Sequence, residues 1–340
     1  MLTSNNTPYQ VETILDKDID LNPMLVVVIK ATYDFNPSGH VQLSTKQVPI
    51  TYGDEMTEAK PVASVRFESD LAPFKPKGDF VVVGHAMTQN RSVTMMDVGF
   101  RFGSMEKVVK VLGDRVWHSQ GMLAGITPSN PEPFEEMELT FDRSFGGIDM
   151  NHGEVCTANP SGKGIFHKKS KKEEILGQPL PNVEDPSHLI KTWKDKPNPI
   201  GMGYIAKGWS QRIGLMGTYD DEWKENRNPD RPVDFDFNYY NAAPVDQQVD
   251  GYFKGDEVIE LLNMTPGQDQ VQFQLPNIHP RAFVEKIDGS GLESIVLNLD
   301  TVCVISKTLQ FTLVWRGWTA VEDPLMQGVK SLMIEPHKSM

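Results

Sequence analysis

The sequence predicts a mainly β protein, built as antiparallel sandwich-like or barrel-like β-rich halves with few short helices. Apolar runs are short and rich in β-branched residues, which is typical of strands. Turn residues separate these runs about every 8–12 positions, as in antiparallel sandwiches and barrels. Long stretches with the 3.6-residue period of an amphipathic helix are almost absent from the sequence.

The clearest predicted strand is the run of Leu, Val and Ile at residues 24–33. Further strands are expected in the N-terminal half at 79–84, 92–100 and 108–112, and in the last third at 294–299, 301–305 and 309–315. Trp315 and Trp318 belong to the last strand pair, where we expect both to pack in the core. One short helix is predicted over 220–226, because acids occupy its first turn and Pro229 follows.

Three segments organise the chain. Residues 1–149 form an N-terminal β-rich half, and residues 197–330 form a C-terminal one. Between them, residues 150–196 are rich in proline and lysine and carry little periodic hydrophobicity. Long connections of this kind are functional or disordered, so we expect an insertion or linker that supplies little core. We expect the two halves to form one integrated domain.

Composition excludes several classes of partner. The 340 residues carry a formal net charge of −13, and a chain this acidic repels both nucleic-acid backbones and anionic membrane surfaces. No apolar run reaches the roughly 18 residues of a membrane span. The N-terminus lacks the basic and apolar regions of a signal peptide. With only Cys156 and Cys303, a disulfide scaffold is not indicated, and we expect a cytoplasmic protein. Cys303 lies in an apolar run where a buried thiol is expected.

Three loops carry dense backbone constraints. The segment 196–204 holds Pro197 and Pro199, which fix φ, together with two glycines that allow positive φ or a close backbone approach. Similar loops occupy 141–147 and 239–247. We expect these loops to be mainly structural, displayed on a rigid β scaffold. The residues assigned to this role are Arg143, Phe145, Gly146, Gly147, Asn198, Pro199, Gly201 and Gly203. Asp142 and Arg143 are expected to pair with each other or to bond loop carbonyls.

No constellation of catalytic residues is evident, so we predict that the chain is not an enzyme and needs no cofactor or metal. The pair Asp234 and Asp236 resembles the two carboxylates of a glycosidase, and a carbohydrate-active or cell-wall enzyme is therefore the alternative function. His152 and Cys156 lack the second ligand pair that a zinc site requires. A solvated loop is the favoured interpretation there.

Exposed aromatic and arginine side chains dominate binding at protein interfaces. Such residues gather in polar, loop-like sequence near the third loop: Trp223, Arg227, Tyr239, Tyr240 and Asn241. Packing beneath long loops explains the three aromatics equally well, and both interpretations stay open. We predict that a partner protein docks on 223–247, with the segment 150–196 closing over it.

Eight motifs occur in order along the chain, at 27–32, 68–76, 79–84, 113–117, 141–147, 197–204, 240–247 and 313–316. Together they resemble a family of bacterial adaptor proteins, long known only as a domain of unknown function, encoded beside type VI secretion genes. The resemblance spans roughly residues 5–318. It implies a cytoplasmic chaperone that holds a toxic effector and helps mount it on the VgrG spike, with a PAAR tip protein, without being an enzyme. Met202 stands where the family tends to have Arg or Lys, so this loop lacks a positive charge.

Overall fold

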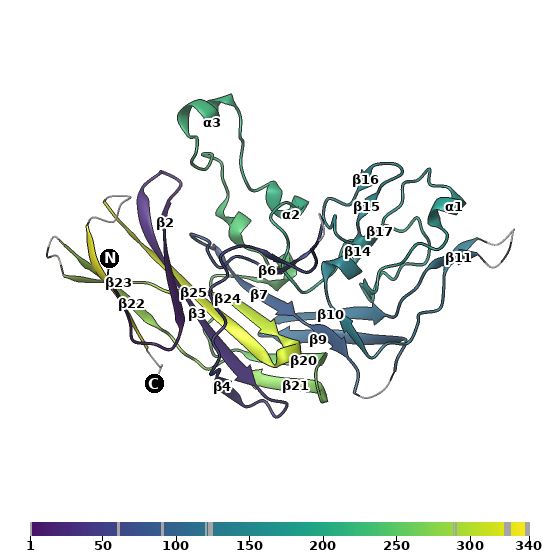
Figure 1. Ribbon diagram of the computed structural model, residues 1–340, viewed down its shortest axis with the longest axis horizontal. Helices are drawn as coiled ribbons and strands as arrows, with labels where there is room; N and C mark the ends of the chain where they lie inside the picture. Colours follow the sequence, from purple (N-terminus) through teal and green to yellow (C-terminus); the bar gives the residue numbers. More distant parts are fainter. Residues whose placement is uncertain are drawn as a thin grey trace.

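The computed structural model describes residues 2–336, except 60–61, 90–91, 120, 122–124, 288, 290 and 323–327. Throughout the described residues the chain is mainly β, as predicted, and its sheets are open rather than closed into a barrel. Most strand pairs are antiparallel, with a few parallel exceptions. Figure 1 shows a wide body of sheets from which one helical arm projects.

A seven-stranded sheet forms the centre of the body. Its hydrogen-bonded order is β19-β7-β24-β25-β3-β2, with β4 beside β3. The bounds are β2 (Gln10–Lys17), β3 (Pro23–Phe35), β4 (Val41–Leu43), β7 (Lys77–Val83), β19 (Gln248–Asp250), β24 (Asn298–Ile305) and β25 (Gln310–Ala320). Since β3 pairs with β25 along most of its length, the two ends of the chain build the same sheet.

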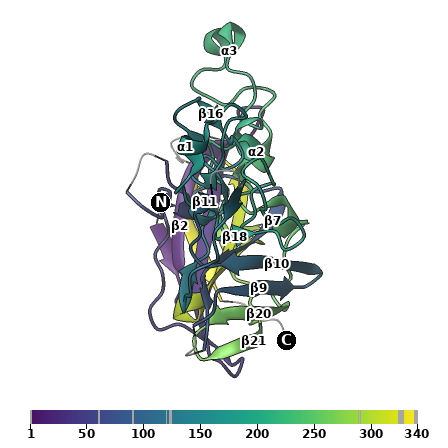
Figure 2. The same cartoon turned by 90° about the vertical axis from the view of Figure 1, so that its right-hand side faces the viewer.

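Two further sheets cover one face of the seven-stranded sheet. The five-stranded sheet contains β18 (Val183–Glu184), β10 (Met105–Leu112), β9 (Met95–Phe102), β20 (Val258–Thr265) and β21 (Gln268–Gln274) in hydrogen-bonded order. Figure 2 shows β10, β9, β20 and β21 as successive neighbours. The four-stranded sheet contains β1 (Leu2–Asn5), β26 (Val329–Glu335), β22 (Arg281–Lys286) and β23 (Leu292–Ile295).

Aromatic side chains join the layers of this sandwich. Phe80 of β7 stacks on Phe102 of β9 with ring centroids 4.4 Å apart. Phe35 of β3 stacks on Phe273 of β21 at 4.2 Å. The same core cluster includes Leu332 of the four-stranded sheet. Stacked pairs of this kind add to the stabilisation that burial of their apolar area already gives.

The predicted strands are found, with two corrections. The run 294–299 is divided, because β23 ends at Ile295 and β24 begins at Asn298, and the two strands belong to different sheets. Trp315 is buried as expected, but Trp318 is 47% exposed. Residues three apart on a strand point to opposite faces, so these two tryptophans could not share one core.

The second face of the seven-stranded sheet lies under irregular segments and is held by buried ion pairs. Lys30 Nζ lies 2.8 Å from Asp70 Oδ2, and Lys75 Nζ lies 2.9 Å from Asp79 Oδ2. The Cys303 thiol is buried here as predicted, and burial raises its pKa to about 11. Both cysteines are free thiols, so no disulfide links them.

The segment 150–196 forms a lobe with its own core. Ile165, Ile175 and Leu180 pack with Trp117 and Phe145 in a separate hydrophobic cluster. The expectation that this segment supplies little core is therefore wrong. The apolar residues are too widely spaced for a periodic signal, yet they converge once the loop folds back on β10 through β18. The lobe and its neighbourhood contain β11 (Trp117–Ser119), β12 (Ile126–Pro128), β14 (Phe145–Gly146), β15 (Ile148–Asp149), β16 (Glu154–Val155), β17 (Lys163–Gly164) and α1 (Lys172–Ile175).

The remaining elements are short. They are β5 (Glu55–Met56), β6 (Val65–Phe67), β8 (His85–Met87), β13 (Glu136–Glu138), α2 (Ser210–Ile213), α3 (Asp221–Asn226), η1 (Phe141–Arg143), η2 (Phe237–Tyr240), η3 (Val245–Gln247) and η4 (Ser306–Thr308). The predicted helix is confirmed as α3, and the Asp220 side chain caps it by accepting a hydrogen bond from Trp223 N.

The helix α3 lies at the tip of an arm, here defined as residues 215–236, that projects from the body (Figures 1 and 2). Polar contacts to the end of β2 and to the turn after it hold the arm. Asp230 pairs with Lys17 at 2.8 Å, Arg231 pairs with Asp16 at 2.7 Å, and Arg227 Nη2 donates to Ile19 O at 2.7 Å. No α3 side chain is buried, so these contacts, together with the buried Phe235 at the base, set the position of the arm.

Candidate functional site

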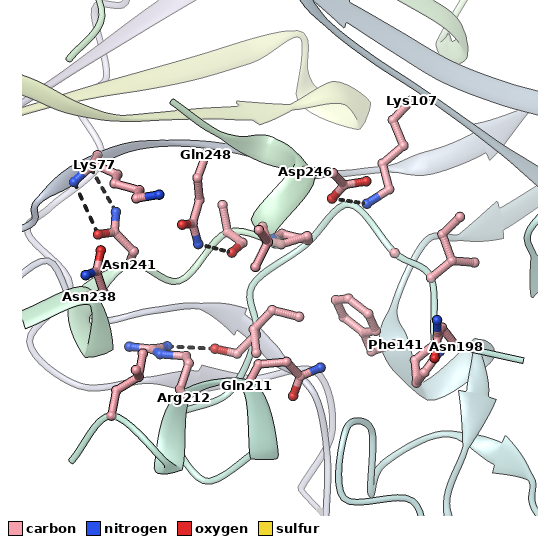
Figure 3. A pocket seen from close by; sticks show the side chains of 18 of the residues that line it. Lys77, Lys107, Phe141, Asn198, Gln211, Arg212, Asn238, Asn241, Asp246 and Gln248 are labelled. Carbon is pink, nitrogen blue, oxygen red and sulfur yellow. Dashed lines mark hydrogen bonds and ion pairs between the residues drawn. The ribbon is translucent and has the colours of Figure 1, made fainter. Parts of the chain in front are cut away.

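An open groove of about 730 Å³ lies at the foot of the arm. Its walls come from the loop 198–201, from α2, and from the segment 236–248. In Figure 3, Phe141 and Asn198 lie on one side, Asn238 and Asn241 lie on the opposite side, and Arg212 lies below. The structure thus brings together three motif loops that the sequence showed only as separate segments.

Phe141 and Gly201 make the apolar side of the groove. The Phe141 ring packs edge-on against Trp209, with centroids 5.2 Å apart. A Cβ at position 201 would lie 2.7 Å from the same ring, so only glycine fits. The predicted close approach is therefore confirmed for Gly201. Gly203 has no positive φ, and a Cβ built there would meet only Val82 O, at 4.0 Å, so that expectation is wrong for it.

Two amide side chains fasten the segment 240–247 to β7. Asn241 Nδ2 donates to Lys77 O at 2.8 Å and to Asp79 Oδ1 at 3.0 Å. Gln247 Nε2 donates to Phe80 O at 2.8 Å and to Met202 O at 3.0 Å. Asn241 and Gln247 are buried, and these bonds satisfy their polar atoms. Asn241, assigned to partner binding from the sequence, therefore holds the groove wall from within.

Arg212 of α2 ties together the segments beneath the groove. Its guanidinium donates to Ile205 O at 2.7 Å, to Tyr239 O at 2.8 Å and to Glu68 Oε1 at 2.7 Å. Burial raises the pKa of Glu68, while Arg212 and Lys75 act in the opposite direction. Nothing in the sequence pattern linked Glu68 to a residue so far along the chain.

Buried asparagines hold the loop 141–147. Asn159 Nδ2 donates to the carbonyls of Phe141 and Phe145, at 2.8 and 2.9 Å. Asn182 Oδ1 accepts from Arg143 Nη1 at 3.3 Å. Arg143 thus bonds a side-chain amide oxygen rather than the expected loop carbonyl. The backbone carbonyl of Asn159 lies only 2.2 Å from where a Cβ of residue 146 would sit, and φ there is +150°, so this position requires glycine.

Asp142 and Met202 have roles that the sequence did not indicate. Asp142 Oδ2 accepts from Thr57 Oγ1 at 2.8 Å and from Ser64 N at 3.3 Å, which ties the loop to a distant segment. Met202 is 1% exposed and belongs to the main core. The side chain at position 202 thus fills the interior instead of facing a partner.

The predicted partner-binding aromatics lie on the arm and at its base, and are half-buried. Trp223 packs against Tyr219 with ring centroids 4.7 Å apart, and its Nε1 donates to Asp230 O. Tyr239 and Tyr240 instead join Phe235 in a second aromatic group. The aromatics therefore form two separate, partly exposed groups rather than one buried cluster. The Arg227 guanidinium donates hydrogen bonds to Arg231 O and Ile19 O at the base of the arm.

Three acidic and three basic side chains line the groove. Asp185 lies on one wall, and a backbone hydrogen bond from Ser187 N lowers its pKa. Asp236 caps η2 and is exposed. Burial lowers the pKa of Lys107, although its ion pair with Asp246 at 2.9 Å opposes this effect. The arm adds seven acidic against three basic residues, a net charge of −4 out of the chain's −13.

A family model described as "Uncharacterized protein conserved in bacteria (DUF2169)" matches residues 20–316. The chain belongs to the DUF2169 family. All of the segments that line the groove fall inside the matched range. No curated protein and no solved structure matches the chain.

In this DUF2169 protein the two acids of the alternative enzymatic hypothesis have local structural partners. Asp234 accepts from Thr218 N and Oγ1, and these bonds lower its pKa. A general acid at neutral pH needs the opposite shift. Asp236 accepts from Asn238 N as the cap of η2. Asp234 is exposed, so it lacks the apolar setting that raises the pKa of a glycosidase acid.

His152 and Cys156 have neighbours other than a metal-ligand set. His152 stacks on His167 and lies 3.3 Å from Glu174, while Cys156 remains a free thiol. Within the described ranges, no group of three or more His, Cys, Asp or Glu side chains is placed to hold a metal ion. None of the helices in the described part of the chain has the length and hydrophobicity needed to cross a membrane.

Proposed function

We propose that this DUF2169 protein is a non-enzymatic, cytoplasmic adaptor of type VI secretion. It binds a toxic effector and helps load it onto the VgrG spike, together with a PAAR tip protein. The proposal starts from the eight ordered motifs in the sequence, which resemble such adaptors. Its partners are proteins, and it requires neither nucleic acid nor a membrane.

The observation that carries the proposal is the convergence of three motif segments on one groove. The segments 141–147, 197–204 and 240–247 each supply lining residues. Their buried members, such as Asn241 and Gln247, bond to the scaffold, while Asn198 and Val245 remain exposed in the groove. A rigid frame that presents exposed loop residues is the arrangement expected of a protein-binding surface.

The arm supports the same proposal. Tyr219 is 44% exposed and packs on the half-buried Trp223, while ion pairs to the body hold the base of the arm in place. An aromatic pair on a fixed support loses little conformational entropy on binding, which favours it as an anchor for a partner. The acidic character of the arm favours a partner with a basic surface.

Deletion of the gene in its native host tests the proposal. We expect delivery of one cognate effector to stop, while the secretion sheath still assembles and other effectors are still delivered. Complementation with the wild-type gene should restore delivery. Unchanged delivery of every effector would show that the chain is not an adaptor for this system.

A further inference from the structure

The floor of the groove offers an apolar surface of limited size. Ile200 and Leu215 are half-buried there, and Val245 is 77% exposed at its edge. A volume of about 730 Å³ is in the range of small-ligand pockets. The groove is open, however, and its walls are irregular loops, which suits a few residues of an extended chain better than an enclosed small molecule.

Asn198 supplies an unused amide at the rim. Its side chain is exposed and makes no hydrogen bond within the described residues. The flanking Pro197 and Pro199 fix the local backbone, so the amide is held in place at little entropic cost on binding. An amide carries both donors and an acceptor. It can therefore pair with an N–H and a C=O of a peptide backbone laid along the groove.

The free charge around the groove is negative. Its basic side chains are already engaged: Arg212 with Glu68, Lys107 with Asp246, and Lys77 with Asp250. Asp185 and Asp236 also line the groove and accept hydrogen bonds from backbone N–H groups. Among the described residues neither has a Lys or Arg partner, and the one ionisable neighbour of Asp185 is His188 at 3.2 Å. Asp236 is the last residue of the acidic arm. Complementary charge would attract and orient a basic segment.

We propose that the groove binds an extended basic segment of a partner polypeptide. An apolar side chain of that segment packs on Ile200 and Leu215, its backbone bonds to Asn198, and its Lys or Arg residues face Asp185 and Asp236. This inference rests on the proposed adaptor function and names the feature of the partner that the groove recognises.

A random 12-residue peptide library displayed on phage, selected on the immobilised full chain, tests the chemistry. We expect enriched peptides to carry Lys or Arg within a few positions of a large apolar residue. The best peptide is then synthesised with a fluorescent label, and its Kd is measured by anisotropy. Raising the salt concentration should weaken binding, because exposed charges are screened. No enrichment, or a neutral or acidic consensus, would overturn the proposal.

Charge-removing variants locate the binding. Asp185→Asn with Asp236→Asn removes two charges but keeps the acceptor oxygens that cap the local turns. We expect Kd to rise at least tenfold. The matched control, Asp256→Asn with Asp269→Asn, changes two exposed acids near the β20–β21 hairpin and should stay within twofold. Equal binding by both double variants would contradict the proposal.

A second pair of variants changes exposed residues only, so that a loss of binding does not reflect a loss of folding. Asn198→Arg adds a positive charge to an exposed rim residue and should also raise Kd at least tenfold. Asn130→Arg, at an exposed residue beyond β12, is its control and should leave Kd within twofold. Wild-type affinity of Asn198→Arg would contradict the proposal.

The two proposals can fail separately. If no peptide binds the groove while effector delivery still requires the gene, the groove proposal alone fails. If delivery does not require the gene, the adaptor function fails.

Discussion

The substitution Arg212→Met should destabilise the fold more than any other single change around the groove. It removes hydrogen bonds to Ile205 O and Tyr239 O and the 2.7 Å ion pair with Glu68, which is left with a longer contact of 3.7 Å to Lys207. The two charged side chains are 3% and 6% exposed. Breaking a buried pair of this kind costs about 3–5 kcal/mol. At about 2 °C per kcal/mol for a chain of this size, Tm should fall by roughly 6–10 °C.

The stability lost in Arg212→Met should decrease as the pH falls. Burial raises the pKa of Glu68 in the folded state, and loss of Arg212 raises this pKa further. A carboxyl with a raised folded pKa is unfavourable above that pKa and is relieved by protonation. The difference in Tm between wild type and variant should therefore shrink as the pH falls from 7.5 toward the unfolded value of about 4.3.

Two controls accompany this measurement by thermal unfolding. Glu68→Gln combined with Arg212→Met removes the orphaned charge and should recover part of the lost stability. Arg281→Met breaks an ion pair with Glu335 whose side chains are 50% and 33% exposed, and should cost less than about 1 kcal/mol. Two results would refute the reasoning. One is a loss of unfolding free energy below about 1 kcal/mol for Arg212→Met. The other is a Tm difference between wild type and variant that is the same at pH 5 and pH 7.5.

Three further changes test other parts of the structure. Gly201→Ala places a Cβ against a buried ring and should cost about 1–3 kcal/mol in thermal unfolding, so a neutral result would contradict the packing. Asn159→Ala removes the amide donor that bonds two buried loop carbonyls and the acceptor of Ser161 Oγ, and should cost about 2–4 kcal/mol, whereas Asn198→Ala should change stability by less than about 0.5 kcal/mol. Deleting 150–196 exposes Trp117, which is 1% exposed in the intact chain, and should red-shift the tryptophan emission with loss of the lobe; an unchanged spectrum would show that the lobe core is dispensable.

Local chemistry explains which elements the sequence could predict. The strand β3 is buried on both faces, so its sequence is an uninterrupted apolar run that is easily recognised. The helix α3 has acids in its first turn, a capping Asp220 and a following proline, and each of these signals is short-range. Predictions of this kind need only the residues within one or two turns.

Contacts between distant segments could not be predicted. Glu68 and Arg212 are 144 residues apart, and each is polar, so neither suggests a buried position. The lobe core has the same problem, since Ile165, Ile175 and Leu180 show no helical or strand period. Only the folded chain places them around Trp117.

For the candidate site, the sequence identified loops but not their arrangement. Asn198, Pro199 and Gly201 were recognised from proline and glycine content and do line the groove. Asp185 and Leu215, which complete its walls, lie outside the motif loops, and no local signal marks them. Burial of Met202 has no local signal either, because the two flanking glycines give no apolar period.

Co-purification from the native host tests the central claim most directly. The tagged wild-type protein and the Trp223→Ala, Tyr239→Ala double variant are expressed at equal levels, and their bound proteins are quantified by mass spectrometry. If the chain is an effector-loading adaptor that docks its partner at the arm, one effector and the VgrG spike protein should be enriched with the wild type and depleted with the variant. Absence of both proteins from the wild-type sample would contradict the adaptor function, and their equal recovery with the variant would contradict docking at the arm.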